Sequence, residues 1–595
     1  MCRNRADRHG FVFLVVSRID SINPVINPNS CLLLRLPFRL RGLLPSMGIR
    51  LDEIRKEVSV RVLPRPYVTV MMGQRVPGDD WSLAKSLQMA KFEKNPGETI
   101  TLNLILVYNG RHFHHSREDC LAIYDKIRDM CNRYNARYRL PTAPFQLIEA
   151  GEKQQHWGPI KKLFAEKLPP NVFVLDFCKN DIAYHVLKEL FLQKGYLSQM
   201  LNFDRYDHLR RMDRKSDTIL QNLSRQMLNK CGEWFWFADL PPTIPEKVLL
   251  VGIDVFHAPL QWNKKSKEQT RKPSCGAIVL LSRENRVFSC YSEAVSVPAG
   301  QELGLGPQIA ATICRARGLL RFNPDACYVF RDGVGEDQIA SLKEDEVVHV
   351  REALKGEKQV GRVLASTSSS SSASSRSSSS SSSSPAAPCS SSSSAPDDPV
   401  QAIGESSETA STKKRRRIRK KKTNNTMSGD EQGQVQQAET KLEHASAPSD
   451  VHDKTVEREI PLIYVVAQKR IERRFVSECG KKPLPPGTVI DAIQGCNRDH
   501  YIFYLTGSCP SFSTPKPLKC TVIVQDAIKS KGKDREDIVQ LVWALCHNYP
   551  NWVGSVKLPV VTQLAHKLAE LAGGFPDGAG NPELYKSFAN TLFYL

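Results

Sequence analysis

The chain has 595 residues, of which 41% are hydrophobic and 8% aromatic, and its formal net charge is +20. This length gives room for roughly two to four domains and at least one large hydrophobic core. Nine positive charges lie in residues 413–422 and residues 1–46 carry a surplus of five, which leaves only six for the rest. Net charge therefore does not establish a nucleic-acid partner, and such a site has to be argued from local residues.

Sixteen cysteines are scattered along the chain, and no two of them have C-x-x-C spacing. This arrangement gives no support for a zinc ribbon or a disulfide framework, so reduced thiols in an intracellular protein are expected. No apolar run approaches the roughly 18 residues that a membrane-spanning helix requires. We therefore expect no membrane insertion.

Residues 1–46 are rich in arginine and poor in acids, with short apolar clusters broken by Asn and Pro. A mitochondrial targeting segment has this composition, and an extension upstream of a start at Met47 fits it equally well. Residues 47–140 combine β-like runs with a helical pattern at 117–138. We interpret them as an α+β linker region that is too short for two domains.

From residue 145 onward, predicted strands and helices alternate. A buried strand at 171–177 is followed by helices at 181–193 and about 217–230. Such alternation indicates parallel strands with covering helices, which is an α/β layer. A run of uncharged residues then leads into Asp254, followed by strands at 276–282, 286–294 and 326–330 and a helix at 306–320.

A segment of different composition interrupts this pattern at about 361–456. It contains a Ser tract, the basic run 413–422, and a stretch rich in Asp, Glu and Gln. This composition buries too little apolar surface to offset ordering entropy, so we predict a disordered Ser-rich and basic insert. The α/β pattern resumes afterwards, with strands at 461–467, 487–490, 500–506 and 518–525 and helices at 535–548 and 558–572. The insert therefore splits the fold and does not end it.

Two carboxylates each close a hydrophobic strand. Asp254 follows the uncharged run that begins at Val248, and Asp332 follows the strand 326–330. Carboxylates at the ends of adjacent strands can share divalent cations about 4 Å apart, and Mg²⁺ prefers such oxygen ligands. An ordinary turn is the competing interpretation for both residues.

Four motifs occur in a recognisable order: VGIDVFH at 251–257, VFRDGVGE at 329–336, PPGTVID at 485–491, and NWVG at 551–554 followed by AHKLA at 565–569. Their order and spacing resemble the PIWI domain of Argonaute/PIWI proteins. The resemblance covers roughly residues 240–595. It implies an α/β fold in which a MID domain (141–240) precedes an RNase H-like PIWI domain (245–595) interrupted by the insert.

The resemblance also implies a catalytic Asp-Glu-Asp-His set that uses Mg²⁺ or Mn²⁺. Asp254, Asp332 and His566 match its metal ligands, although His566 alone would be an ordinary helix-face histidine. Glu302, on a glycine-containing loop, matches the remaining acid. It precedes Asp332 by 30 residues, about two fewer than the family pattern, so Glu293 stays as an alternative.

A MID domain of this family holds the 5′ phosphate of a guide strand. Tyr184 and Lys188 are four residues apart on the predicted helix 181–193 and therefore share a face; a solvated helix face is the competing interpretation. The resemblance adds Gln199, Lys230 and the C-terminal Leu595 to this pocket. Tyr184 would stack on the first base while the lysines neutralise phosphate.

One departure from the family concerns the PAZ domain, which grips the 3′ end of the guide. Residues 48–140 are too few for an N-terminal domain and a PAZ domain, and no aromatic cluster in them is recognisable as PAZ. Two principal hypotheses therefore stand. The chain is a guide-directed endonuclease, or it is a guide-binding scaffold that does not cut; an RNase H-like nuclease without a guide is a third.

The expected partners are a small guide RNA or DNA and a complementary target strand, bound by a monomer with room for accessory proteins. An intracellular location is expected, with the cytoplasm first. Residues 1–46 point to the mitochondrion, whereas the basic run 413–422 matches a nuclear-import signal or an RNA-binding tail. A solvated charge block without any address explains that run equally well.

Overall fold

The computed structural model describes residues 10–21, 49–70, 74–78, 87, 99–108, 116–134, 137–150, 157–163, 165, 168–179, 181–213, 215–259, 261–263, 268–270, 272–284, 287–355, 459–471, 474–477, 483–491, 500–508, 516–527, 534–575 and 587–595. All of them belong to one compact unit, formed by Met1–Ser371 and Glu457–Leu595. The insert predicted at about 361–456 lies outside the described residues, as does most of the predicted extension 1–46.

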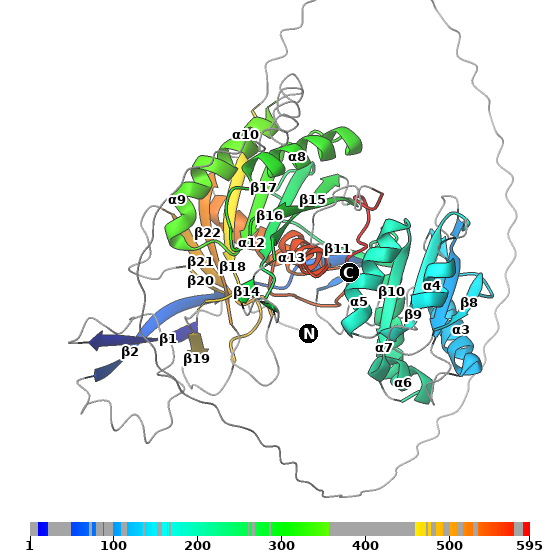
Figure 1. The fold of residues 1–595 in the computed structure, drawn as a ribbon. Helices are drawn as coiled ribbons and strands as arrows, with labels where there is room; N and C mark the ends of the chain where they lie inside the picture. The colour runs from blue at the N-terminus through cyan, green and yellow to red at the C-terminus, as the bar shows by residue number, and fades with distance from the viewer. Residues whose placement is uncertain are drawn as a thin grey trace, which may run out of the picture. The chain divides into compact units, whose positions relative to one another are not determined.

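A mixed sheet forms the centre of this unit (Figure 1). Its first five strands, in spatial order, are β16 (Val287–Val297), β15 (Ser274–Glu284), β12 (Val248–Phe256), β17 (Ala326–Asp332) and β18 (Leu462–Gln468). β16, β15 and β12 pair antiparallel, whereas β12, β17 and β18 run parallel to one another. These are the strands that the sequence predicts, and their arrangement confirms the expected α/β architecture.

Six further strands extend the sheet beyond β18, and each pairs antiparallel with its neighbour. They are β22 (Leu518–Gln525), β21 (Tyr501–Leu505), β20 (Thr488–Ile490), β2 (Ile49–Val62), β1 (Gly10–Ser21) and β19 (Arg474–Ser477). β1 lies within the segment that the sequence assigns to an extension or targeting signal. Polar and apolar residues alternate only weakly in this segment, so its sequence did not indicate a strand.

Helices cover both faces of the five-stranded part. Successive side chains of a strand point to opposite faces, so alternate residues of β12 contact the helices on different sides of the sheet. Leu249, Val251 and Ile253 pack against α8 (Gly306–Leu320), α9 (Ile339–Leu342) and α10 (Val348–Leu354). Val248 and Leu250 pack against α12 (Asp534–Leu545) and α13 (Val560–Gly573). Figure 1 shows α8, α9 and α10 together on one side of the strands and α13 on the other.

The short helices around residues 336–354 were not predicted. The 3-10 turn Glu336–Gln338, α9, the π-helical turn Lys343–Val347 (η5) and α10 follow one another without a break. Each is too short to show the helical periodicity on which sequence analysis depends. They place Glu346 beneath the sheet, fully buried.

α13 packs directly onto β12 at Gly252. A Cβ atom at this position would lie 2.2 Å from the carbonyl oxygen of Val561, on α13. Only a residue without a side chain permits such an approach between helix backbone and strand. Asp254 points to the same face as Gly252, since the two are separated by one residue in a strand.

A second sheet contains four parallel strands, in the order β10 (Leu197–Asn202), β9 (Val172–Lys179), β6 (Asn103–Tyr108) and β8 (Gln146–Glu149). Its helices are α3 (Arg117–Arg133), α4 (Trp157–Leu163), α5 (Asp181–Gln193), α6 (Phe203–Arg211) and α7 (Ser216–Lys230). β6 and α3 come before residue 141, so the predicted boundary between linker and MID domain cuts through this sheet. The helix predicted at 117–138 is also shorter than expected.

Short strands complete the described elements. β11 (Trp236–Ala238) pairs with β3 (Tyr67–Val70) and β3 with β4 (Arg75–Pro77), and two further pairs are β5 (Ile100–Thr101) with β7 (Tyr138–Arg139) and β13 (Gln261–Asn263) with β14 (Glu268–Thr270). Among the helices that the structure describes, none is both long and apolar enough to cross a bilayer.

Candidate functional site

Two buried carboxylates lie side by side at the ends of adjacent strands. β12 and β17 run parallel with Ile253 opposite Arg331, which puts Asp254 and Asp332 next to each other at the same edge. Both residues are almost fully buried, with 4% and 2% exposure. In each, Oδ1 accepts a hydrogen bond from the following backbone amide, at 3.0 Å for Asp254 and 2.9 Å for Asp332. The Oδ2 atoms are left for other groups.

His566 joins this pair from α13. Its Nδ1 atom lies 2.7 Å from Oδ2 of Asp254. The close packing of α13 on Gly252 brings the helix near enough for this contact. The structure therefore brings together three of the four predicted catalytic residues, Asp254, Asp332 and His566.

Lys469 also enters the cluster, and sequence analysis missed it. Its Nζ atom lies 2.6 Å from Oδ2 of Asp332, 3.7 Å from Oδ2 of Asp254 and 3.2 Å from Nδ1 of His566. Burial and the neighbouring Asp254 raise the pKa of Asp332, and the Lys469 ammonium opposes this shift. Lys469 directly follows the apolar strand β18, so it repeats the pattern of a charged residue closing a buried strand.

Glu302 lies close to the cluster but is held by other groups. Its Oε2 atom is 2.7 Å from Nε2 of His257, and its Oε1 atom is 3.1 Å from a guanidinium nitrogen of Arg331. A Cβ atom at Gly333, the residue after Asp332, would lie 2.5 Å from Oε1 of Glu302. Burial raises the pKa of Glu302, while Arg331 and His257 lower it. Glu302, the predicted fourth acid, therefore lies next to the aspartate pair. Its carboxylate is paired with Arg331 and His257.

Arg331 fixes Glu302 from inside the core. It has no exposed surface and lies between two carboxylates, with Nε 3.3 Å from Glu346. Glu346 also accepts a hydrogen bond of 2.6 Å from the hydroxyl of Tyr464. A buried arginine needs such partners, because an unpaired charge in the core is strongly destabilising. Arg331 is adjacent to Asp332 in sequence. Its role in holding Glu302 could not be predicted, because its second partner, Glu346, lies on helices that were not predicted.

Glu293, the alternative to Glu302, is held by hydrogen bonds that link a strand to a helix. Its carboxylate accepts hydrogen bonds from Arg315 Nε at 2.7 Å, from Thr312 at 2.8 Å and from Tyr291 at 2.5 Å. These partners join β16 to α8. The geometry therefore favours Glu302 over Glu293 as the acid beside the aspartate pair.

The chemistry of the donors fits a divalent cation, but their present arrangement is closed. Two adjacent carboxylates supply the oxygen ligands that Mg²⁺ and Mn²⁺ prefer, and imidazole is a common ligand of transition metals. Yet no three His, Cys, Asp or Glu side chains within the described part of the chain stand in a ready metal-binding arrangement. In this arrangement Lys469 contacts Oδ2 of Asp332, and His566 contacts Oδ2 of Asp254.

A second cluster of predicted residues lies in the four-stranded sheet. The ammonium of Lys188, on α5, donates to the carbonyl and hydroxyl oxygens of Ser198 at 2.6 and 2.9 Å. Lys230, the last residue of α7, donates to the same carbonyl at 2.8 Å. Both lysines are buried. Burial and, next, the positive charge of Lys188 hold the pKa of Lys230 well below its ordinary value.

The other predicted pocket residues lie on the same elements or on the adjoining core. Nε2 of Gln199, next to Ser198, donates to the carbonyl of Met200 at 3.1 Å, and its buried Oε1 has no hydrogen-bond partner among the described residues. The ring of Tyr184 lies 5.9 Å from Nζ of Lys188, and burial raises its pKa to about 12. Leu595 belongs to the hydrophobic cluster on which Tyr184 packs. Sequence analysis missed Ser198, which holds the two ammonium groups together.

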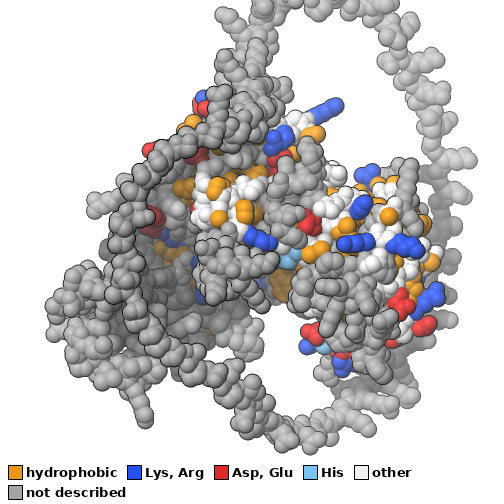
Figure 2. All heavy atoms as spheres, in the orientation of Figure 1, with side chains coloured by type: hydrophobic (Ala, Val, Ile, Leu, Met, Phe, Trp, Pro, Cys, Tyr) orange, Lys and Arg blue, Asp and Glu red, His pale blue; other side chains and the backbone are white. Residues whose placement is uncertain are grey.

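Basic side chains are prominent around this sheet. Figure 2 shows lysines and arginines gathered on the visible face over the part of the molecule that carries α4, α5 and β10.

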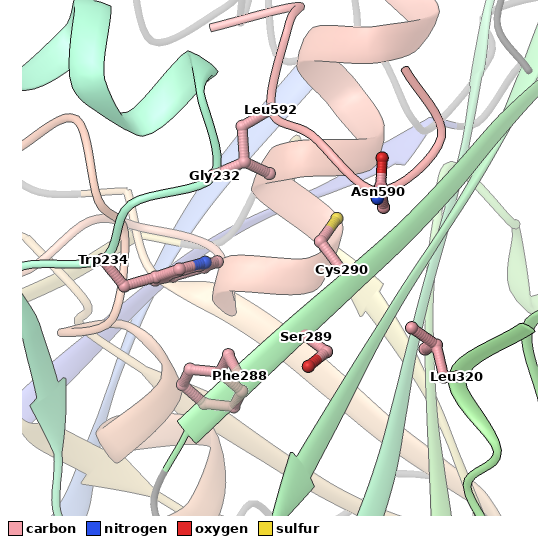
Figure 3. Close-up of a pocket in the computed structure, with 8 residues that line it drawn as sticks. All are labelled: Gly232, Trp234, Phe288, Ser289, Cys290, Leu320, Asn590 and Leu592. Atoms are coloured by element: carbon pink, nitrogen blue, oxygen red, sulfur yellow. The ribbon is translucent and has the colours of Figure 1, made fainter. Parts of the chain in front are cut away.

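A separate cavity of about 220 Å³ lies near the end of the chain (Figure 3). The rings of Trp234 and Phe288, 5.3 Å apart, line it together with Cys290 and Leu592. Its lining includes none of the predicted site residues.

The sequence matches the Piwi domain over residues 172–366 and 429–575, together more than half of the chain. Piwi-like protein 1 of Schmidtea mediterranea is 32% identical over 171 residues, which cover 27% of this chain and 21% of that protein. Piwi-like protein 1 of Gallus gallus is 36% identical over 115 residues, covering 19% of this chain and 13% of that protein.

Solved structures show the same fold. The structure of Drosophila Piwi aligns with a TM-score of 0.59 and 17% identity, covering 95% of this chain and 60% of that chain. Kluyveromyces polysporus Argonaute, solved with a guide RNA, aligns with a TM-score of 0.60 and 15% identity over 91% of this chain and 54% of its own. The chain thus spans little more than half of these structures. It belongs to the Argonaute/Piwi family of Piwi-domain proteins.

Proposed function

We propose that this chain holds the 5′-phosphorylated end of a small guide strand, pairs the guide with a complementary target, and hydrolyses the target with Mg²⁺ or Mn²⁺. The observation that carries this proposal is the strand-end pair Asp254 and Asp332, with His566 of α13 at 2.7 Å from Asp254. Residues far apart in sequence converge there on one group of carboxylate oxygens.

Asp254, Asp332 and His566 would hold the cations, and Glu302 would complete the set. Held by these residues, divalent cations would supply the Lewis acidity that activates a water and stabilises the leaving oxygen of the phosphodiester. The backbone amides of Val255 and Gly333 hold one oxygen of each aspartate, which orients the other for the cation. Burial of both acids excludes water and strengthens their interaction with positive charge.

The lysine pair supports guide binding. Lys188 and Lys230 direct two ammonium groups at one carbonyl oxygen, and a phosphate beside them would offset their mutual repulsion. Tyr184, within reach of Lys188, would stack on the first base, since aromatic rings are common platforms for nucleic-acid bases. The guide is RNA or DNA: Kluyveromyces polysporus Argonaute was solved with a guide RNA and Clostridium butyricum Argonaute with a guide DNA.

A second candidate is a guide-binding scaffold that does not cut. Three contacts favour it. The ammonium of Lys469 forms an ion pair with Asp332 at 2.6 Å, and Glu302 is paired with both Arg331 and His257. All three contacts engage acids that the proposed cleavage requires.

A cleavage assay separates these candidates. The protein is loaded with a 5′-phosphorylated guide and given a labelled complementary target in Mg²⁺ or Mn²⁺. Asp254→Asn and Asp332→Asn are expected to lower the rate by roughly 10³-fold, because each removes several kcal/mol of cation-dependent stabilisation. As a control, Asp337→Asn removes an exposed acid that follows β17, the strand of Asp332. This change is expected to leave the rate unchanged.

Each outcome favours one candidate. Cutting that persists in Asp254→Asn and Asp332→Asn contradicts the assigned site. Tight guide binding without any turnover selects the scaffold. Cutting that needs no guide, and that is indifferent to its 5′ phosphate, selects a nuclease without a guide.

A further inference from the structure

Lys469 contacts both aspartates of the strand-end pair. Its ammonium lies 2.6 Å from Oδ2 of Asp332 and 3.7 Å from Oδ2 of Asp254. These are the oxygens left over after Oδ1 of each aspartate has accepted a backbone amide. We propose that Lys469 is a tethered counter-cation of this pair, which competes with divalent metal for the same oxygens and must withdraw when metal binds.

The fold forces this side chain toward the aspartates. β18 runs parallel to β17 with Ala467 opposite Asp332, so Lys469 lies just past the end of its strand. The backbone is anchored on both sides, because Gln468 donates from Nε2 to the carbonyl of Val334 at 2.6 Å and Lys557 donates to the carbonyl of Lys469. The side chain is 21% exposed. Lys469 is therefore held at its base, while its side chain is partly exposed to solvent.

Charge balance explains why a cation is required there. Two carboxylates that are 5% and 3% exposed at the side chain lie next to each other, and burial of like charges is costly without a counter-charge. One ammonium supplies a single positive charge, whereas a divalent cation supplies two. An Mg²⁺–oxygen bond is about 2.0–2.1 Å long. Lys469 cannot keep its contact with Oδ2 of Asp332 while a cation occupies that oxygen from the same side.

This inference rests on the proposed metal binding at Asp254 and Asp332, and its test measures binding, not cleavage. Mn²⁺ is titrated into purified nucleic-acid-free protein while free Mn²⁺ is followed by electron paramagnetic resonance. Binding that disappears in an Asp254→Asn/Asp332→Asn double variant is assigned to the site. Lys469→Met keeps most of the length of the side chain and removes its charge, so it is expected to bind Mn²⁺ about tenfold or more tightly.

Two matched variants isolate the cause. Lys469→Arg keeps the positive charge and is expected to bind Mn²⁺ no more tightly than the parent. Arg470→Met removes a charge from the exposed neighbouring residue and is expected to change the affinity less than about twofold, since exposed charges are screened. If Lys469→Met is poorly soluble, Lys469→Gln is compared with the parent by the rise in melting temperature that Mn²⁺ produces, which is expected to be larger.

The possible failures are distinct. Equal or weaker Mn²⁺ binding by Lys469→Met overturns the competition and leaves the metal site standing. No site-specific Mn²⁺ binding by any variant overturns both the competition and the proposed metal-dependent cleavage.

Discussion

Nδ1 of His566 lies 2.7 Å from Oδ2 of Asp254, although 312 residues separate the two along the chain. The contact exists because α13 rests on β12 at Gly252, where a Cβ atom would lie 2.2 Å from the carbonyl oxygen of Val561. The geometry of the site thus depends on one residue without a side chain.

Gly252→Ala is expected to destabilise the protein. The added methyl group must displace the backbone of α13, and overpacking of this kind typically costs about 1–3 kcal/mol. The urea midpoint is expected to fall, and the His566 contact with Asp254 to lengthen. Gly318→Ala is the control, because its Cβ meets nothing within 4 Å; in a helix this change stabilises by about 0.5–1 kcal/mol. Equal midpoints for the two variants would contradict the packing described.

Lys188→Ala and Lys230→Ala are expected to weaken binding of a 5′-phosphorylated guide. A hydrogen bond to a charged group contributes about 1.5–3 kcal/mol, so each change lowers affinity by roughly 10- to 100-fold. Affinity for a guide with a 5′ hydroxyl is expected to change much less. Lys194→Ala, an exposed lysine just beyond the same helix, serves as control. Equal losses for both guides in a filter-binding assay would count against a phosphate pocket.

Glu302→Gln and Glu293→Gln are expected to act on different properties. Glu302→Gln removes a carboxylate beside the aspartate pair, and cleavage is expected to fall roughly 10- to 100-fold, as for other groups that support a metal site. Glu293→Gln weakens the link to the half-exposed Arg315 and is expected to lower stability by about 1 kcal/mol, with cleavage unchanged. The reverse pattern would reassign the fourth acid to Glu293.

His547 is expected to make stability depend on pH. Burial lowers its pKa to about 4, a shift that its hydrogen bond to the Trp543 carbonyl partly opposes. The unfolded chain takes up a proton near pH 6.5, so stability is lost as pH falls from 6.5 toward 4, by about 3 kcal/mol in total. Urea midpoints from pH 7.5 to 4.5 are expected to fall less steeply for His547→Gln. Parallel curves for the variant and the parent would refute the assignment.

The sequence predicted the elements whose pattern is local and strong. β12, β17 and β18 are long apolar runs, and a charged residue closes each, so Asp254 and Asp332 could be singled out from their strands alone. His566 could not, because its position on α13 looks like an ordinary helix face. Only the resemblance to a family linked it with Asp254 across most of the chain.

What the sequence did not reveal depends on contacts between distant segments. Lys469 shows the same strand-end pattern as the aspartates, but this pattern alone does not indicate that its ammonium turns toward the two acids. Arg331 and Glu346 form a buried pair only because several short helices follow β17. Those helices are too short to show a recognisable period in the sequence. The pairing of β6 with β9 was not predicted for a similar reason, since α3, β7, β8 and α4 lie between these two strands in the sequence.

Asp526 connects the two chain segments that border residues 356–458. It forms an ion pair with Arg351 of α10 at 2.8 Å and accepts the backbone amide of Leu462, at the start of β18, at 2.9 Å. Both contacts lie at the edge of the sheet opposite the strand ends that carry Asp254 and Asp332. A break in the peptide chain between α10 and β18 would leave them in place, so the protein is expected to work as two separately expressed fragments that assemble into one molecule.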